Sequence, residues 1–205
     1  MGILDLFRRP APIADRAGLM DFVDAQAAFL GQKGVFEYSR AAAGPYGNIL
    51  FNDKGFLAAV EVSRWQSYPL GLMMVGEMVE GELRRAAADR ATQIREELAK
   101  IILGVFDRYA TPPVVDAVAW QEARNEIDRE FGAAALHPIR RIADIPARYA
   151  GRYVGVMPIH EKLRSKDTGT IHNYLKSNLI NMHDIFVRRA DLPALVARLA
   201  TPVGS

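Results

Sequence analysis

Apolar residues recur along this chain at spacings of three and four, and they seldom alternate with polar ones. One face of an α-helix repeats every 3.6 residues, whereas one face of a β-strand repeats every two. The spacing therefore predicts an all-α fold, a compact multi-helix bundle of about seven helices. Because no repeat or long linker divides the chain, we expect residues 1–205 to form a single helical domain, with 1–13 as a short N-terminal arm.

Capping residues and prolines divide this pattern into segments. Aspartates, asparagine, threonine and prolines predict where helices start, and glycine or proline predicts where they end. The expected helices cover 15–43, 52–67, 69–88, 89–106, 116–132, 144–158, 168–190 and a short stretch from 191. Two details are open to test: Gly132 is expected to end its helix in a left-handed cap, and Tyr153–Ile159 is favoured as helix over strand.

Composition excludes several classes of protein. The chain has no cysteine, so it has no disulfides, thiolate metal sites or cysteine nucleophiles, and a reducing cytoplasm is the favoured location. Its net charge of +2 lacks the basic excess of a dedicated nucleic-acid-binding protein, so we expect no specific nucleic-acid partner. No apolar stretch approaches the length of a membrane-spanning helix.

The first residues are apolar and are followed by two arginines, Arg8 and Arg9. The segment is too short for a secretory signal, and its bases follow the apolar residues instead of preceding them. Two alternatives are open: Met1 to Arg9 makes a weak membrane-surface contact, or these residues form a helical turn docked on the core. The second alternative is favoured.

Charge is unevenly distributed along the chain. Residues 1–136 contain 15 bases and 19 acids, a net charge of −4, whereas residues 137–189 contain 10 bases and 4 acids, a net charge of +6. All four histidines also fall in the later segment. This region is therefore where we expect an anionic ligand or partner to bind, unless its bases simply form solvated helix faces.

The segment after Thr168 shows where such a ligand could bind. At 100° per residue, Asn178 falls within the apolar stripe of Ile171 and Leu175, so its amide is expected to bond a neighbouring helix or to face a polar pocket. Bases and imidazoles gather beside that stripe and in the residues just before it. The predicted ligand-binding residues are His160, Arg164, Lys166, His172, Lys176, Asn178 and His183.

Motifs for catalysis or metal binding are missing. None of the serines stands in a Gly-x-Ser-x-Gly motif, and no glutamate stands three residues before a histidine, as a Glu-x-x-His metal motif requires. Three glycines spaced five residues apart, Gly71, Gly76 and Gly81, fall within a predicted helix, where they favour close helix packing and not a phosphate loop. We therefore expect no metal and no cofactor, and no catalytic residue is assigned.

Two functions fit these patterns. The first is a helical protein that binds a protein partner or an anionic small molecule through the basic C-terminal region. The alternative is a hydrolase or transferase that uses a histidine as its acid–base group and arginines to hold an anionic substrate. Homo-oligomerisation is also compatible with the long amphipathic helices.

Three stretches of the sequence carry a resemblance: the opening Met1–Arg9, Arg64-Trp65 followed by Tyr68–Leu72, and Met157–Arg164 with Asn173–Lys176. In these residues the chain resembles a family of short, uncharacterised bacterial proteins, some of which carry an automatic esterase label. The resemblance spans most of the chain. Since no esterase signature stands in these residues, the resemblance implies no catalytic position.

Overall fold

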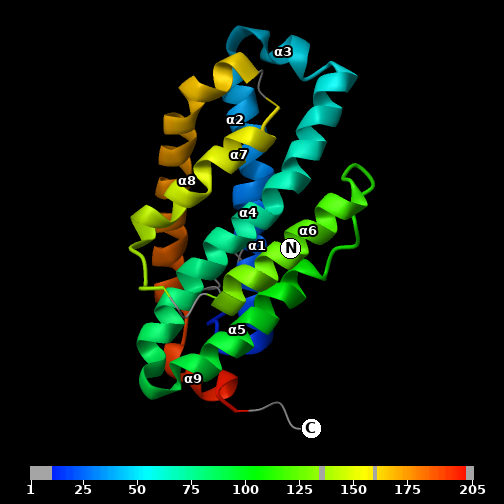
Figure 1. Cartoon of the computed structure of the whole chain (residues 1–205). Coiled ribbons are helices and arrows are strands. Elements are labelled where there is room, and N and C mark those ends of the chain that lie inside the picture. The colour runs from blue at the N-terminus through cyan, green and yellow to red at the C-terminus, as the bar shows by residue number, and fades with distance from the viewer. Residues whose placement is uncertain (1–10, 134–136, 159–160, 202–205) are drawn as a thin grey trace, which may run out of the picture.

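Helix α4 (Lys54–Ala87) runs the length of the molecule, and the other helices surround it (Figure 1). The computed structural model describes residues 11–133, 137–158 and 161–201. The other α-helices are α1 (Arg16–Ala28), α2 (Gly34–Ala43), α3 (Gly47–Leu50), α5 (Ala91–Phe106), α6 (Ala117–Ala133), α7 (Ala150–Val156), α8 (Glu161–Arg189) and α9 (Leu192–Leu199). A π-helical turn, Phe29–Lys33, joins α1 to α2 without a break, and a 3-10 helix, Ile142–Arg148, precedes α7.

The all-α prediction is confirmed. Counting α1, the π-helical turn and α2 as one continuous helix, the described residues form eight helices and no strand, close to the seven expected. One pair of backbone hydrogen bonds, from Ile13 to Arg189 and from Asp191 to Ile13, ties the described part of the predicted arm to the end of α8. Ile13 is buried there and belongs to the core, whereas Ala11 and Pro12 are exposed.

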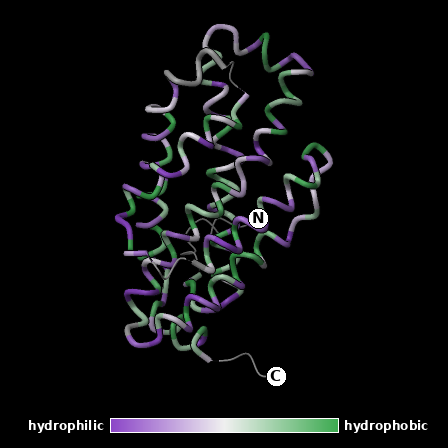
Figure 2. The backbone as a smooth tube through the Cα atoms, in the orientation of Figure 1, coloured by the Kyte–Doolittle hydropathy of each residue, from purple (hydrophilic) through white to green (hydrophobic). Residues whose placement is uncertain are grey.

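The core lies around α4, which is buried on every side from Ser67 to Gly76. A helix that is apolar all round is stable in water only when other elements cover it completely. Its neighbours do so, and each of them carries both apolar and polar residues along its length (Figure 2). None of the described helices is long and apolar enough to cross a membrane.

Helix α4 corrects one prediction. The sequence predicts one helix ending at Ser67 and another starting at Pro69, yet a single helix passes through Pro69. Proline removes a backbone donor and usually breaks a helix, but packing can override that tendency. Here Tyr68, Pro69 and Leu70 are all buried, and the Ser67 hydroxyl bonds the carbonyl oxygens of Gly31 at 2.8 Å and Arg64 at 3.1 Å.

Close backbone approach holds α4 against the π-helical turn. A Cβ atom added to Gly31 would lie 2.7 Å from the Cα of Tyr68, and one added to Gly71 would lie 2.7 Å from the carbonyl oxygen of Ala27. A side chain at Gly76 or Gly81 would likewise meet Phe131 or Ile139. The prediction that Gly71, Gly76 and Gly81 serve close packing is therefore confirmed.

Four aspartate caps lie where the sequence predicts helix starts. Asp15, Asp53, Asp116 and Asp191 each accept a hydrogen bond from a backbone N–H three residues later, at 2.7–3.0 Å. Such a bond satisfies one of the free N–H groups in the first turn of a helix. These helix starts are therefore confirmed.

Two expected boundaries are wrong. Helix α8 begins at Glu161, not at Thr168, because the good helix formers between them continue the helix through the threonine. Among the described glycines only Gly44 has a positive φ, so Gly132 does not form the expected left-handed cap. Tyr153–Val156 is helical, as favoured.

Candidate functional site

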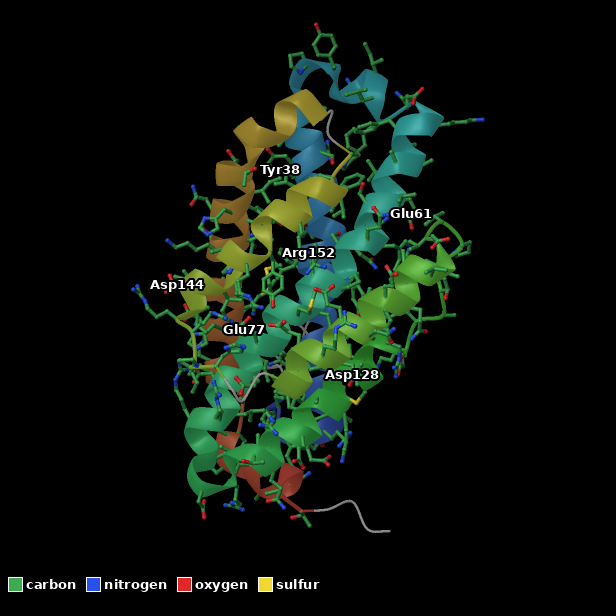
Figure 3. The ribbon with its side chains drawn as sticks, in the orientation of Figure 1. Tyr38, Glu61, Glu77, Asp128, Asp144 and Arg152 are labelled. Carbon is green, nitrogen blue, oxygen red and sulfur yellow. The ribbon has the colours of Figure 1, made fainter. Side chains whose placement is uncertain are left out.

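The basic C-terminal region folds back onto the acidic first part of the chain. Arg140 Nη1 lies 2.5 Å from a carboxylate oxygen of Glu77 on α4, and Arg152 on α7 forms a bidentate pair with Glu126 on α6 at 2.5 and 2.6 Å. Figure 3 labels Glu77 and Arg152 on this side of the bundle. Arg148 pairs with Glu130 at 2.5 Å. Each of these three arginines therefore has a carboxylate partner within the same chain.

The tyrosines that alternate with these arginines form a packed ridge. Tyr149 and Tyr153 are buried, while Arg148 and Arg152 lie beside them in the ion pairs just described. The Tyr153 hydroxyl donates to the carbonyl oxygen of Leu30, and burial raises the pKa of this phenol. Both the tyrosines and the arginines of this segment therefore have structural partners within the molecule.

Helix α8 carries the predicted residues that the structure places on a common side. His172, Lys176 and His183 are all half-buried and border the buried stripe of Ile171, Leu175 and Met182. His183 Nε2 lies 2.9 Å from Glu82 on α4, and its Nδ1 lies 3.8 Å from Asp184. Among the described residues His172 and Lys176 form no ion pair.

Asn178 does not do what the sequence suggests. Its side-chain amide donates a 2.8 Å hydrogen bond to the carbonyl oxygen of Tyr174, one turn earlier on the same helix, and the residue is half-buried. An amide that bonds its own helix needs no partner from a neighbouring helix. Asn178 therefore does not lock two helices together, and it lies on the opposite edge of the apolar stripe from His172 and Lys176.

Three predicted residues have no described side chain. His160 lies outside the described residues, and Arg164 and Lys166 belong to the first turns of α8, where only the backbone is described. The Met1–Arg9 segment, for which a docked helical turn is favoured over a weak membrane-surface contact, also lies outside the described residues.

A side-chain hydrogen bond connects α8 to α2. The Tyr38 hydroxyl bonds Asp167, and burial together with this carboxylate raises the pKa of Tyr38 to about 12. Figure 3 labels Tyr38 on α2, beside α8. This hydrogen bond joins α8 to α2 near the start of the segment that carries His172 and Lys176.

Sequence reasoning missed a polar cavity between α4, α6 and the stretch 137–140. Glu80 is 6% exposed, and its burial raises the pKa of the carboxyl group. Arg84 Nε lies 3.0 Å from Glu80 Oε1, but neither atom is placed for a hydrogen bond. Other lining residues include Glu77, His137 and Arg140. Since Glu80 stands inside a buried run, the reasoning applied to Asn178 would have singled it out.

The size and chemistry of this cavity restrict what it can do. The centre of a water molecule can reach about 30 Å³ of it, which is room for roughly one or two waters. A buried carboxyl group with a raised pKa, arginines and an imidazole are the side chains that acid–base catalysis uses. The cavity is therefore a candidate site for a water and a small anionic group.

No three His, Asp or Glu side chains within 11–133, 137–158 and 161–201 are grouped so that they could hold a metal ion. The family resemblance stays a prediction. In the comparisons with known proteins, no family model, no curated protein and no solved structure matches the chain.

Proposed function

We propose that the protein works by binding an acidic protein partner through one side of α8. We call this surface the α8 flank and define it by His172, Lys176, Ile180, His183 and Val187. At 100° per residue these side chains fall within about 80° of the helix circumference. Arg164, Lys166 and His160 stay predicted ligand-binding residues near the N-terminal end of α8 but are not part of this definition, and Asn178 lies across the apolar stripe from it.

The observation that carries the proposal is how the fold uses the C-terminal bases. Arg140, Arg148 and Arg152 have carboxylate partners inside the molecule, whereas Lys176 has none among the described residues. A base without an internal partner is the one that is free to meet an external anion. The described bases of residues 137–189 that have no close carboxylate partner thus lie on α8, apart from the exposed Arg141, which is 3.8 Å from Asp144.

Apolar groups on the same flank favour a protein partner over a small molecule. Ile180 is 38% exposed and Val187 is 47% exposed, although both are large and apolar. Small molecules bind mostly in concave sites, whereas the side of a helix offers a ridge that another protein can cover. The α8 flank combines the two kinds of contact, apolar and basic, that an acidic amphipathic surface would complement.

A quantitative affinity pull-down tests the proposal. The bait is the full chain, and the variant combines His172→Ala, Lys176→Glu and Ile180→Ser. Arg129→Glu, at an exposed base on α6, is the matched control. We expect at least one captured protein to fall about tenfold with the flank variant and to be retained by the control. Equal capture by all three baits would refute the α8 flank as the binding surface.

The cavity beside Glu80 favours a second candidate function, a hydrolase or transferase. Glu80 and His137 line it and supply two acid–base groups. Arg84 and Arg140 lie against Glu80 and Glu77, so they would hold an anionic substrate by exchanging these partners. Hydrolysis of p-nitrophenyl acetate and p-nitrophenyl phosphate by the wild type, lost in both His137→Ala and Glu80→Gln, would support it. Absence of turnover by the wild type on both compounds would count against it.

A further inference from the structure

An open groove runs along the outer side of α2, on a face that the α8 flank does not include. Two hollows of about 530 and 490 Å³ adjoin at Phe36, which lines both. We call them together the α2 groove and define it by Phe29, Lys33, Phe36, Arg40, Phe51 and Arg64. From Phe29 to Arg40 the groove follows a single continuous helical path.

All charged side chains lining the two hollows are cations: Lys33, Arg40 and Arg64. Lys33 and Arg40 are exposed and form no ion pair with any described residue. Arg64 pairs with Glu61 at 2.8 Å, and its buried Nε has no hydrogen-bond partner among the described atoms. The groove is therefore electrostatically prepared for an anionic occupant.

The remaining polar side chains of α2 do not neutralise these bases. Tyr38 bonds Asp167 on α8. Glu37 is exposed and lies one helical turn from both Lys33 and Arg40, yet it forms no ion pair with either of them. Lys33 and Arg40 therefore outnumber the one acidic residue of α2.

The floor of the groove is aromatic. Phe36 and Phe51 stack edge to face with ring centroids 5.1 Å apart, and Phe51 meets Phe56 in the same way at 5.2 Å. The ammonium of Lys33 lies 5.1 Å from the centroid of the Phe29 ring. At the α3 end the apolar surface continues outward through Tyr46 and Ile49, which are 68% and 69% exposed.

The spacing of these residues indicates what shape the occupant has. Phe29 and Phe36 line the same hollow, and Lys33 and Arg40 are seven positions apart, about two helical turns. The two bases are thus about 10 Å apart along the axis at 1.5 Å per residue, the distance over which an amphipathic helix repeats its own apolar side. A partner helix can place apolar side chains on the rings and acidic ones beside the bases.

We propose that the α2 groove binds an amphipathic helix of a partner protein, with acidic residues flanking its apolar side. The groove fits such a helix better than it fits a lipid surface, because its rings line hollows between elements. A bilayer would instead contact the convex end of the molecule, at Tyr46 and Ile49 on and beside α3.

Fluorescence anisotropy with two synthetic helical peptides tests this proposal on the full chain. The peptides share their apolar residues and differ only in having Glu or Lys at the flanking positions. We expect the wild type to bind the Glu peptide about tenfold more tightly than the Lys peptide. The double variant Lys33→Glu with Arg40→Glu should reverse this preference, whereas Arg129→Glu should leave it unchanged.

A second variant and a lipid arm complete the test. Phe36→Ala should weaken binding of both peptides by about fivefold or more, since it removes the ring shared by the two hollows. Circular dichroism verifies that each variant is folded. Equal affinity for the two peptides, or an unchanged preference in the double variant, would overturn the proposal. So would a dependence on Lys33 and Arg40 that is seen only with phosphatidylglycerol vesicles and not with the peptides.

Discussion

The Ser67 hydroxyl group donates a 2.8 Å hydrogen bond to the carbonyl oxygen of Gly31 and thereby joins α4 to the π-helical turn. Ser67 is fully buried. Replacing it with alanine leaves the Gly31 carbonyl oxygen without this hydrogen-bond donor, and no water can take the donor's place because the site is buried. We expect Ser67→Ala to lower the free energy of unfolding by about 1–3 kcal/mol, measured by urea denaturation. Ser177→Ala, on an exposed part of α8, should change it by less than about 0.5 kcal/mol.

The same crossing makes Gly31 intolerant of a side chain. An alanine Cβ there would lie 2.7 Å from Tyr68 Cα, and backbone atoms cannot move away cheaply. We expect Gly31→Ala to destabilise the protein by about 1–3 kcal/mol. The control is Gly169→Ala in α8, where nothing lies within 4 Å of the added carbon. Because alanine favours a helix, this control should stabilise the protein by about 0.5–1 kcal/mol. Two thermal melts shifted in the same direction would contradict the close crossing.

The ion pair of Arg140 with Glu77 joins the stretch before α7 to α4. The two side chains are 31% and 17% exposed, so solvent screens the pair only partly. A double-mutant cycle with Arg140→Met and Glu77→Gln should give a coupling energy of about 1 kcal/mol in the free energy of unfolding. A coupling energy indistinguishable from zero would show that Arg140 is free for an external ligand, contrary to the proposal that the bases without a close carboxylate partner lie on α8.

Glu80 should make stability depend on pH. Burial raises the pKa of Glu80 above its ordinary value of 4.5, so the folded state holds the proton more tightly than the unfolded state does. The contribution of a neutral Glu80 is therefore fully present below pH 4.5 and is lost as the pH rises through the raised pKa. The stability of Glu80→Gln relative to the wild type should accordingly increase from pH 4 to pH 7. Glu122→Gln, at an exposed carboxylate on α6, controls for the lost charge. If the difference in unfolding free energy between the wild type and Glu80→Gln did not change with pH, the raised pKa of Glu80 would be refuted.

Local signals in the sequence were sufficient for most of the helices and for four of their caps, although Asp89, expected to start a helix, lies in a 3-10 turn before α5. Asp53 and Asp191 cap helices at the expected positions because a side-chain oxygen reaches a backbone N–H three residues on, whatever lies elsewhere in the fold. Pro69 misled because tertiary packing decides its effect, and here it is enclosed by buried neighbours. Thr168 misled for a local reason, because it follows a run of strong helix formers that start the helix earlier.

The candidate sites were harder to predict, since they depend on pairs far apart in the sequence. The +6 excess of residues 137–189 gave no sign that Arg140 and Arg152 would meet Glu77 and Glu126, because these partners come from other helices. The α8 flank could be placed by counting residues around one helix. The α2 groove could not, because it needs Arg64 from α4 opposite Lys33.

The π-helical turn Phe29–Lys33 gives the long first helix one residue more than a regular α-helix needs over the same rise. An α-helix turns by 100° per residue, so one extra residue in a regular α-helix would rotate every side chain of α2 by about 100° relative to α1. The wider π-helical turn accommodates the extra residue and avoids this rotation. Shortening the turn by one residue should consequently restore regular α-helix while keeping both flanking faces in phase. The extra residue can thus be removed without redirecting Gly34 away from the hydroxyl groups of Tyr153 and Tyr174, which lie directly over it.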